Sequence, residues 1–169
     1  MADHRSLPLT DLSEDEKLFQ ETVRSFADEK IRPLVSKMDQ EAKMPLDLID
    51  ACFELGLMGI ELPESFGGAS STFFMSVLVV EELARVDASV AVLVDVQNTL
   101  FNNALLRWGT PAQKEKYCPK LATKWVGAYA LSEAGAGSGA FAPVSFTHLA
   151  RPASELACIS GGAASFKKK

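Results

Sequence analysis

The sequence predicts an all-α fold of about five helices, followed by the first strand of a β-domain and an irregular tail. Helix-capping pairs recur along the first 125 residues, and apolar residues repeat there at helical spacing. Neither pattern continues beyond residue 138. The 169 residues are enough for one domain with a hydrophobic core.

The first helix is predicted to begin at Ser13, because Ser13 and Glu16 have the spacing of a capping box. Apolar residues follow at close to helical spacing and predict one buried face: Phe19, Val23, Phe26, Ile31, Leu34 and Met38. Pro33 falls inside this pattern, so we expect the helix to be kinked or split there.

Three further helices are expected before residue 110. Pro45 suits the first turn of the second helix, and its inward face is predicted to be Leu46, Ile49, Cys52 and Phe53. The third helix, about residues 71–85, and the fourth, about residues 89–108, are apolar on more than one side, which is typical of core helices. Polar residues interrupt the fourth at Asp95, Gln97, Asn98, Asn102 and Asn103.

A short fifth helix is predicted after Gly109. Thr110, Pro111 and Gln113 supply an N-cap, a first-turn proline and a capping-box glutamine. Lysines give this helix a basic face that we expect to be solvated: Lys114, Lys116, Lys120 and Lys124.

Composition divides the chain into four parts. Residues 1–10 are expected to be a flexible N-terminus, residues 11–125 a helical domain, and residues 126–138 the start of a β-domain. Residues 139–169 are rich in Ala, Ser and Gly and end in three lysines, which predicts an unrelated, disordered tail. At most one short strand is expected there, around residues 141–146.

The bulk properties disfavour several classes of function. A net charge of −5 argues against nucleic acid or an anionic membrane as partner. No apolar run is long enough to span a membrane, and three separated cysteines with two histidines predict no metal site. The first ten residues do not read as a signal or transit peptide, so we expect a cytoplasmic protein, with the mitochondrial matrix as the alternative.

The segment of residues 126–138 carries the strongest chemical signal. A short apolar run leads into a Ser-Glu pair and then a glycine-rich turn, an order that suits close approach to a flat, phosphate-bearing ligand. Gly135, Gly137 and Ala140 also match a dinucleotide fingerprint, with Glu155 beyond them. That fingerprint needs a helix at the glycines, and Pro143 disfavours one.

Four separated segments resemble motifs of the acyl-CoA dehydrogenase family, in the family's order. They are residues 55–60 with 63–68, residues 81–89, residues 109–121 and residues 129–138. The resemblance covers residues 11–138 and is nearest to the short/branched-chain members. It implies a helical N-terminal domain, then a β-domain, then a C-terminal helical bundle.

The resemblance also implies a reaction and partners. In the family, a glutamate removes the α-proton of an acyl-CoA thioester while the β-hydrogen passes as hydride to FAD. Electrons then pass to electron-transfer flavoprotein, and the enzymes are homotetramers. For this chain the implied substrate is a short or branched-chain acyl-CoA.

The resemblance assigns site residues by motif position. Residues implied to contact FAD are Tyr129, Ala130, Leu131, Ser132, Gly135, Gly137 and Ser138, and Ser138 is implied to contact the acyl-CoA substrate as well. The Ser132 hydroxyl is expected near the reactive edge of the flavin, where reduction builds negative charge. Residues 95–100 are expected to floor the acyl pocket or to be plain core.

The match to the family is lost at Gly139, where the family has an aspartate. Its catalytic base comes from the C-terminal domain, so no catalytic residue is predicted in this chain, and Glu133 is given a structural role. As a hypothesis, we interpret the abrupt change as a shifted reading frame or an alternative terminal segment. Two hypotheses follow: a truncated FAD-dependent acyl-CoA dehydrogenase without activity, or a non-catalytic helical module that acts through protein contacts.

Overall fold

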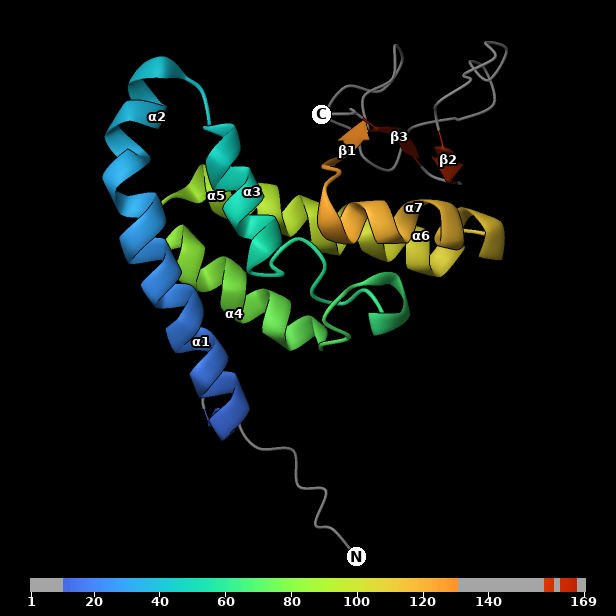
Figure 1. Ribbon diagram of the computed structural model, residues 1–169, viewed down its shortest axis with the longest axis horizontal. Helices are drawn as coiled ribbons and strands as arrows, with labels where there is room; N and C mark the ends of the chain where they lie inside the picture. The colour runs from blue at the N-terminus through green and yellow to red at the C-terminus, as the bar shows by residue number, and fades with distance from the viewer. Residues whose placement is uncertain (1–10, 131–156, 160–161, 167–169) are drawn as a thin grey trace, which may run out of the picture.

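The computed structural model describes residues 11–130, 157–159 and 162–166, and it confirms the all-helical domain (Figure 1). Five helical segments follow one another in the described part of the chain. The first comprises α1 (Glu14–Phe26), a π turn η1 (Ala27–Ile31), a 3-10 turn η2 (Arg32–Leu34) and α2 (Val35–Glu41). The others are α3 (Leu46–Glu54), α4 (Phe73–Ala84), the run of α5 (Ala88–Asp95), η4 (Val96–Asn102) and α6 (Asn103–Trp108), and α7 (Pro111–Thr123).

Both predicted capping boxes are present. At α1 the Glu16 N–H donates to the Ser13 hydroxyl at 3.3 Å, and the Ser13 N–H donates to the Glu16 carboxylate at 2.7 Å. Thr110 and Gln113 repeat this arrangement at α7, with Pro111 in the first turn. The predicted break at Pro33 is also found, because Pro33 lies in the 3-10 turn between η1 and α2.

The prediction for the inward face of α3 is partly wrong. Pro45 is the residue before the helix rather than part of its first turn. Leu46 is 57% exposed, whereas Leu48 and Cys52 are buried. Leu46 and Leu48 are two residues apart, so they lie on roughly opposite sides of the helix, and the buried face contains Leu48 and Cys52 rather than Leu46.

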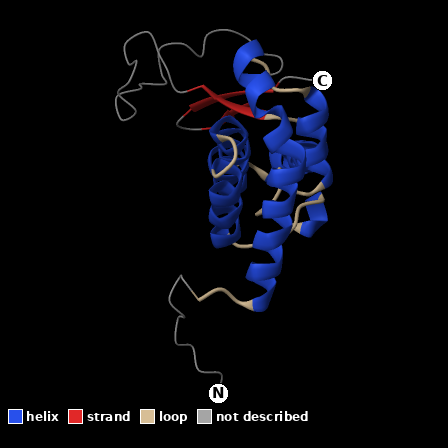
Figure 2. Ribbon diagram, turned by 90° about the vertical axis from the view of Figure 1, so that its left-hand side faces the viewer, coloured by secondary structure: helices blue, strands red, loops and turns tan. Residues whose placement is uncertain are grey.

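Two hydrophobic clusters form the core. The first packs α1, α2, α3, α4 and α5 together around residues such as Val23, Ile31 and Leu83. The second joins η4, α6 and α7 through Phe101, Leu105 and Leu121. Figure 2 shows the helices running alongside one another, with the strands gathered at one end of them.

A buried carboxylate links α1 to α4. Glu82 is only 3% exposed, and its oxygens accept from the Arg24 guanidinium at 2.9 and 2.6 Å and from Arg85 at 3.3 Å. Arg85 also donates to Asp28 at 2.9 Å. The hydrogen bonds from Arg24 hold the pKa of Glu82 below its ordinary value, despite the opposing effect of burial.

A small three-stranded sheet lies beyond the helical domain, and most of the tail predicted to be disordered, residues 139–169, lies outside the described residues. Strand β1 (Gly127–Ala130) pairs antiparallel with β3 (Gly162–Phe166), and β3 pairs antiparallel with β2 (Ala157–Ile159). The two later strands are only three and five residues long and carry no sustained apolar–polar alternation. The pairing of β3 with β1 is a long-range contact that the residues of the strands alone do not reveal.

Candidate functional site

The candidate site lies where β1 leaves the helical domain and passes beside η4. The fourth helix widens here into a π turn of seven residues, Val96–Asn102. Such turns are rare and frequently mark functional positions. Three side-chain amides of this turn are buried: Gln97, Asn98 and Asn102. Each of them contacts a segment that is distant in the sequence.

Gln97 anchors both the end of α7 and the start of β1. Its Nε2 donates to the backbone carbonyls of Leu121 at 3.1 Å and Trp125 at 3.0 Å. Its Oε1 accepts from the N–H of Gly127 at 2.7 Å. One buried side chain therefore satisfies three backbone groups that would otherwise lie unpaired in the core.

Gly127 permits β1 to lie directly against the fourth helix. A Cβ added at this position would lie 2.4 Å from Cγ of the Phe101 ring, well inside contact distance. Phe101 is itself buried in the second cluster. Only glycine therefore allows the strand backbone to approach this ring while keeping its hydrogen bond to Gln97.

Asn98 and Asn102 fasten the loop that follows α3. The Asn98 amide accepts from the Ile60 N–H at 2.9 Å and donates to the carbonyls of Leu57 at 2.7 Å and Val94 at 2.9 Å. Asn102 donates to the Met58 carbonyl at 2.9 Å. The Oδ1 of Asn102 is buried without a hydrogen-bond partner among the described residues.

The structure reaches the predicted flavin segment but describes little of it. The backbones of Tyr129 and Ala130 lie in β1, opposite Ala164 and Ala163 of β3. The other residues predicted to hold FAD lie outside the described residues, as does Glu133: Leu131, Ser132, Gly135, Gly137 and Ser138. Their assignment stays a prediction.

Residues 95–100, predicted as a possible floor of the acyl pocket, include buried, half-buried and exposed side chains. Asp95 is half-buried, and its Oδ1 accepts from the Thr99 hydroxyl at 2.9 Å. Leu100 is exposed, while Gln97 and Asn98 are turned into the protein. In the sequence these polar residues stand out as interruptions of an apolar helix, but their role as anchors is not evident there. The available signal is that several amides occur together in an otherwise apolar helix.

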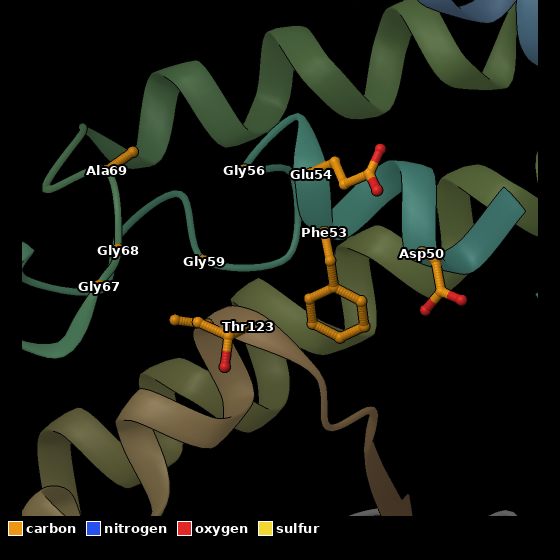
Figure 3. A pocket seen from close by; sticks show the side chains of 10 residues that line it. Asp50, Phe53, Glu54, Gly56, Gly59, Gly67, Gly68, Ala69 and Thr123 are labelled. Atoms are coloured by element: carbon orange, nitrogen blue, oxygen red, sulfur yellow. The ribbon is translucent and has the colours of Figure 1, made fainter. Parts of the chain in front are cut away.

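A separate cavity of about 510 Å³ lies between α3 and the end of α7 (Figure 3). Glycine backbone forms much of its wall, and the Phe53 ring and Thr123 line it together with two carboxylates on α3, Asp50 and Glu54. Gly68 is required there, since its Cβ would lie 2.1 Å from the Leu62 carbonyl oxygen. The described residues place no predicted flavin contact in this cavity.

The described part of the chain also limits other kinds of site. It contains no group of three or more His, Cys, Asp and Glu side chains placed to bind a metal ion. Over the same residues, no helix combines the length and apolar character needed to cross a bilayer.

Comparison with known proteins identifies the family. The sequence model for "Acyl-CoA dehydrogenase, N-terminal domain" matches residues 13–124. The chain therefore belongs to the acyl-CoA dehydrogenase family and contains its N-terminal domain. Members of this family are flavoprotein oxidoreductases that use FAD.

One relative and two solved structures illustrate the similarity. The chain is 50% identical over 135 residues to a Dictyostelium discoideum protein named "Probable short/branched chain specific acyl-CoA dehydrogenase", covering 80% of this chain and 33% of that protein. Butyryl-CoA dehydrogenase from Megasphaera elsdenii superimposes with a TM-score of 0.71 at 32% identity, covering 76% of this chain and 35% of that one. A glutaryl-CoA dehydrogenase from Mycobacterium smegmatis, in complex with FADH2, gives a TM-score of 0.62 at 31% identity, covering 66% and 28%. The chain thus spans about a third of the length of the relatives that it matches.

Proposed function

We propose that the chain contributes the helical wall and first flavin-facing strand of a site for FAD-dependent α,β-dehydrogenation of short or branched-chain acyl-CoA thioesters. The observation that carries this proposal is the double anchoring of β1 at Gly127. Gln97 binds its N–H at 2.7 Å, and the Phe101 ring occupies the space where a Cβ would lie. The predicted flavin contacts begin two residues further along this strand.

The described residues fit the role of holding a flavin-facing strand. A buried amide and a buried ring fix the start of β1, which limits the freedom of the segment that follows. When bound, FAD accepts the β-hydrogen of the substrate as hydride. In this proposal Tyr129 and Leu131 lie against the flavin, Ser132 donates a hydroxyl hydrogen bond at its reactive edge, and Ser138 contacts FAD and the acyl-CoA.

The proposal assigns no proton-abstracting base to this chain. Expressed as these 169 residues alone, the protein should be colourless and should not reduce a dye when a short-chain acyl-CoA is added. In a complete enzyme, electrons would pass to an electron-transfer flavoprotein, and the subunits would form a homotetramer. A yellow preparation of the 169 residues that reduces dye would contradict both the assignment of the base and the alternative of a non-catalytic helical module.

A chimera tests the proposed contribution. Residues 1–138 replace the corresponding part of butyryl-CoA dehydrogenase from Megasphaera elsdenii, and FAD retention and butyryl-CoA-dependent dye reduction are measured. We expect a yellow, active protein whose Ser132→Ala variant turns over more slowly, because a hydrogen bond to the reduced flavin is lost. A folded chimera that retains no FAD would refute the proposal.

A further inference from the structure

A short connection, residues 124–126, joins the end of α7 to the start of β1. Two neighbouring side chains of this connection pack against different parts of the core. The half-buried Trp125 lies against the second hydrophobic cluster, and Val126 lies against the first. The chain therefore contacts both clusters immediately before the strand begins.

Lys120, in the last turns of α7, contacts Trp125 in two ways. Its carbonyl accepts from the Trp125 N–H at 2.7 Å, and its Nζ lies 4.6 Å from the centroid of the Trp125 ring. An ammonium group at this distance is attracted to the electron-rich face of an indole. The Trp125 carbonyl accepts from the Gln97 amide at 3.0 Å. The backbone of Trp125 is thus bound to both α7 and η4, and its ring is held between a cation and the core.

We propose that Trp125, held by Lys120, is a positioning residue that fixes the direction in which β1 leaves the helical domain. The hydrogen bond from Gly127 to Gln97 anchors the strand at one point, and a strand held at one point can pivot about it. Trp125 supplies a second point two residues earlier. This inference rests on the proposed function, because the direction of β1 affects FAD only if the strand carries flavin contacts.

The lever from this pivot to the predicted flavin contact is short. Tyr129 lies two residues beyond Gly127, which is about 7 Å along a strand. A rotation of roughly 9° about Gly127 would move Tyr129 by about 1 Å. A displacement of this size is enough to disturb a site that depends on exact geometry. Fixing the angle of the strand therefore matters as much as fixing its start.

Hydrogen–deuterium exchange of the full 169-residue chain, measured by mass spectrometry, tests the positioning without any cofactor. In Trp125→Leu we expect the amides of residues 126–130 to exchange about tenfold faster or more, while those of α4 keep the wild-type rate. Trp125→Phe keeps a ring beside Lys120 and should stay within about threefold of the wild type. An unchanged rate in β1, or an equal increase in β1 and α4, would overturn the proposal.

The same helix offers a matched control. The Nζ of Lys116 lies 5.1 Å from the centroid of the Tyr117 ring, and this ring also packs against the second cluster, about two helical turns before the connection. Tyr117→Leu and Lys116→Gln should therefore leave exchange in β1 within about twofold of the wild type. Lys120→Gln removes only the cation and should speed that exchange about two- to fivefold. Equal effects of Lys116→Gln and Lys120→Gln would overturn the proposal.

The chimera with butyryl-CoA dehydrogenase tests the consequence for the cofactor. Trp125→Leu should weaken FAD binding about tenfold or more, measured by the flavin fluorescence released on dilution, and Tyr117→Leu should not. A parent chimera that retains no FAD would refute the proposed function and, with it, the purpose given to Trp125. A parent that retains FAD, together with a Trp125→Leu chimera that binds it equally well, would refute the positioning role alone.

Discussion

Gly127→Ala is the sharpest test of how β1 is held against the helical domain. The added Cβ would lie 2.4 Å from Cγ and 2.5 Å from Cδ1 of the Phe101 ring, whereas carbon atoms in contact are about 3.5–4.0 Å apart. The ring is buried and packed, so it cannot turn aside freely. Overpacking of this kind costs about 1–3 kcal/mol.

The displaced strand would also lose part of its hydrogen bond to Gln97. That bond is 2.7 Å long and buried, and a typical hydrogen bond contributes about 1 kcal/mol. We therefore expect Gly127→Ala to lower the free energy of unfolding by about 2–3 kcal/mol. Urea denaturation followed by far-ultraviolet circular dichroism measures this difference.

Two companion variants identify the cause of the loss. Ala128→Ser changes the exposed neighbouring position and should leave the stability within about 0.5 kcal/mol of the wild type. Phe101→Ala alone should cost about 3–5 kcal/mol, but it removes the ring that the new methyl would strike. Gly127→Ala should therefore cost less than about 1 kcal/mol in that background. An equal cost in both backgrounds would refute the steric explanation.

Three further changes test the buried groups. Gln97→Leu should destabilise the fold by roughly 2–4 kcal/mol in urea denaturation, because the Gly127 N–H and two backbone carbonyls lose their partner; a smaller loss would mean that water replaces the amide. The pKa of Glu82 is lowered by its hydrogen bonds to Arg24, so its stabilisation is present above the ordinary value of 4.5 and is lost as the pH falls through the lower, folded value. The urea midpoint should therefore fall more steeply below about pH 5 in the wild type than in Glu82→Gln, and parallel curves would contradict this. Burial raises the pKa of Cys52 to about 12, so iodoacetamide at about pH 8 should modify it only on unfolding; mass spectrometry showing rapid labelling of the native protein would contradict its burial.

Sequence reasoning predicts best where the interaction is local. Ser13 with Glu16, and Thr110 with Gln113, each act across three residues, so the pattern contains both partners. Pro33 likewise acts on the turn that contains it. These features explain why the helices and their order could be predicted before any packing was known.

The same reasoning fails where partners are distant. The Gln97 amide binds groups 24 to 30 residues away, and nothing in the sequence specifies which backbone groups will meet it. The π turns are missed for a related reason, since one extra residue per turn barely alters the apolar pattern. Strand β3 pairs with the distant β1 and with β2, and the residues of β2 and β3 alone do not predict these pairings.

Several residues of the family motifs stabilise helices or join them in the described part of the chain. Glu82 joins α4 to α1, and Asp87 caps α5 by accepting from the Val90 N–H at 2.9 Å. Thr110 caps α7, whose end is tied to η4 through Gln97. These contacts fix α1 to α4, cap α5 and α7, and tie the end of α7 and the start of β1 to η4.

The anchoring of β1 at Gly127 predicts an effect on turnover that is separate from the effect on stability. A displacement of about 1 Å away from the reacting centre can lower a rate about a hundredfold. In the chimera with butyryl-CoA dehydrogenase, Gly127→Ala should therefore reduce kcat about tenfold or more at a temperature where circular dichroism shows the protein fully folded. A matched loss of stability without loss of turnover, obtained with Leu48→Ala in the buried face of α3, is the control. If Gly127→Ala behaves like that control, then the anchor at Gly127 serves the fold alone, and the strand it holds does not set the geometry of the flavin.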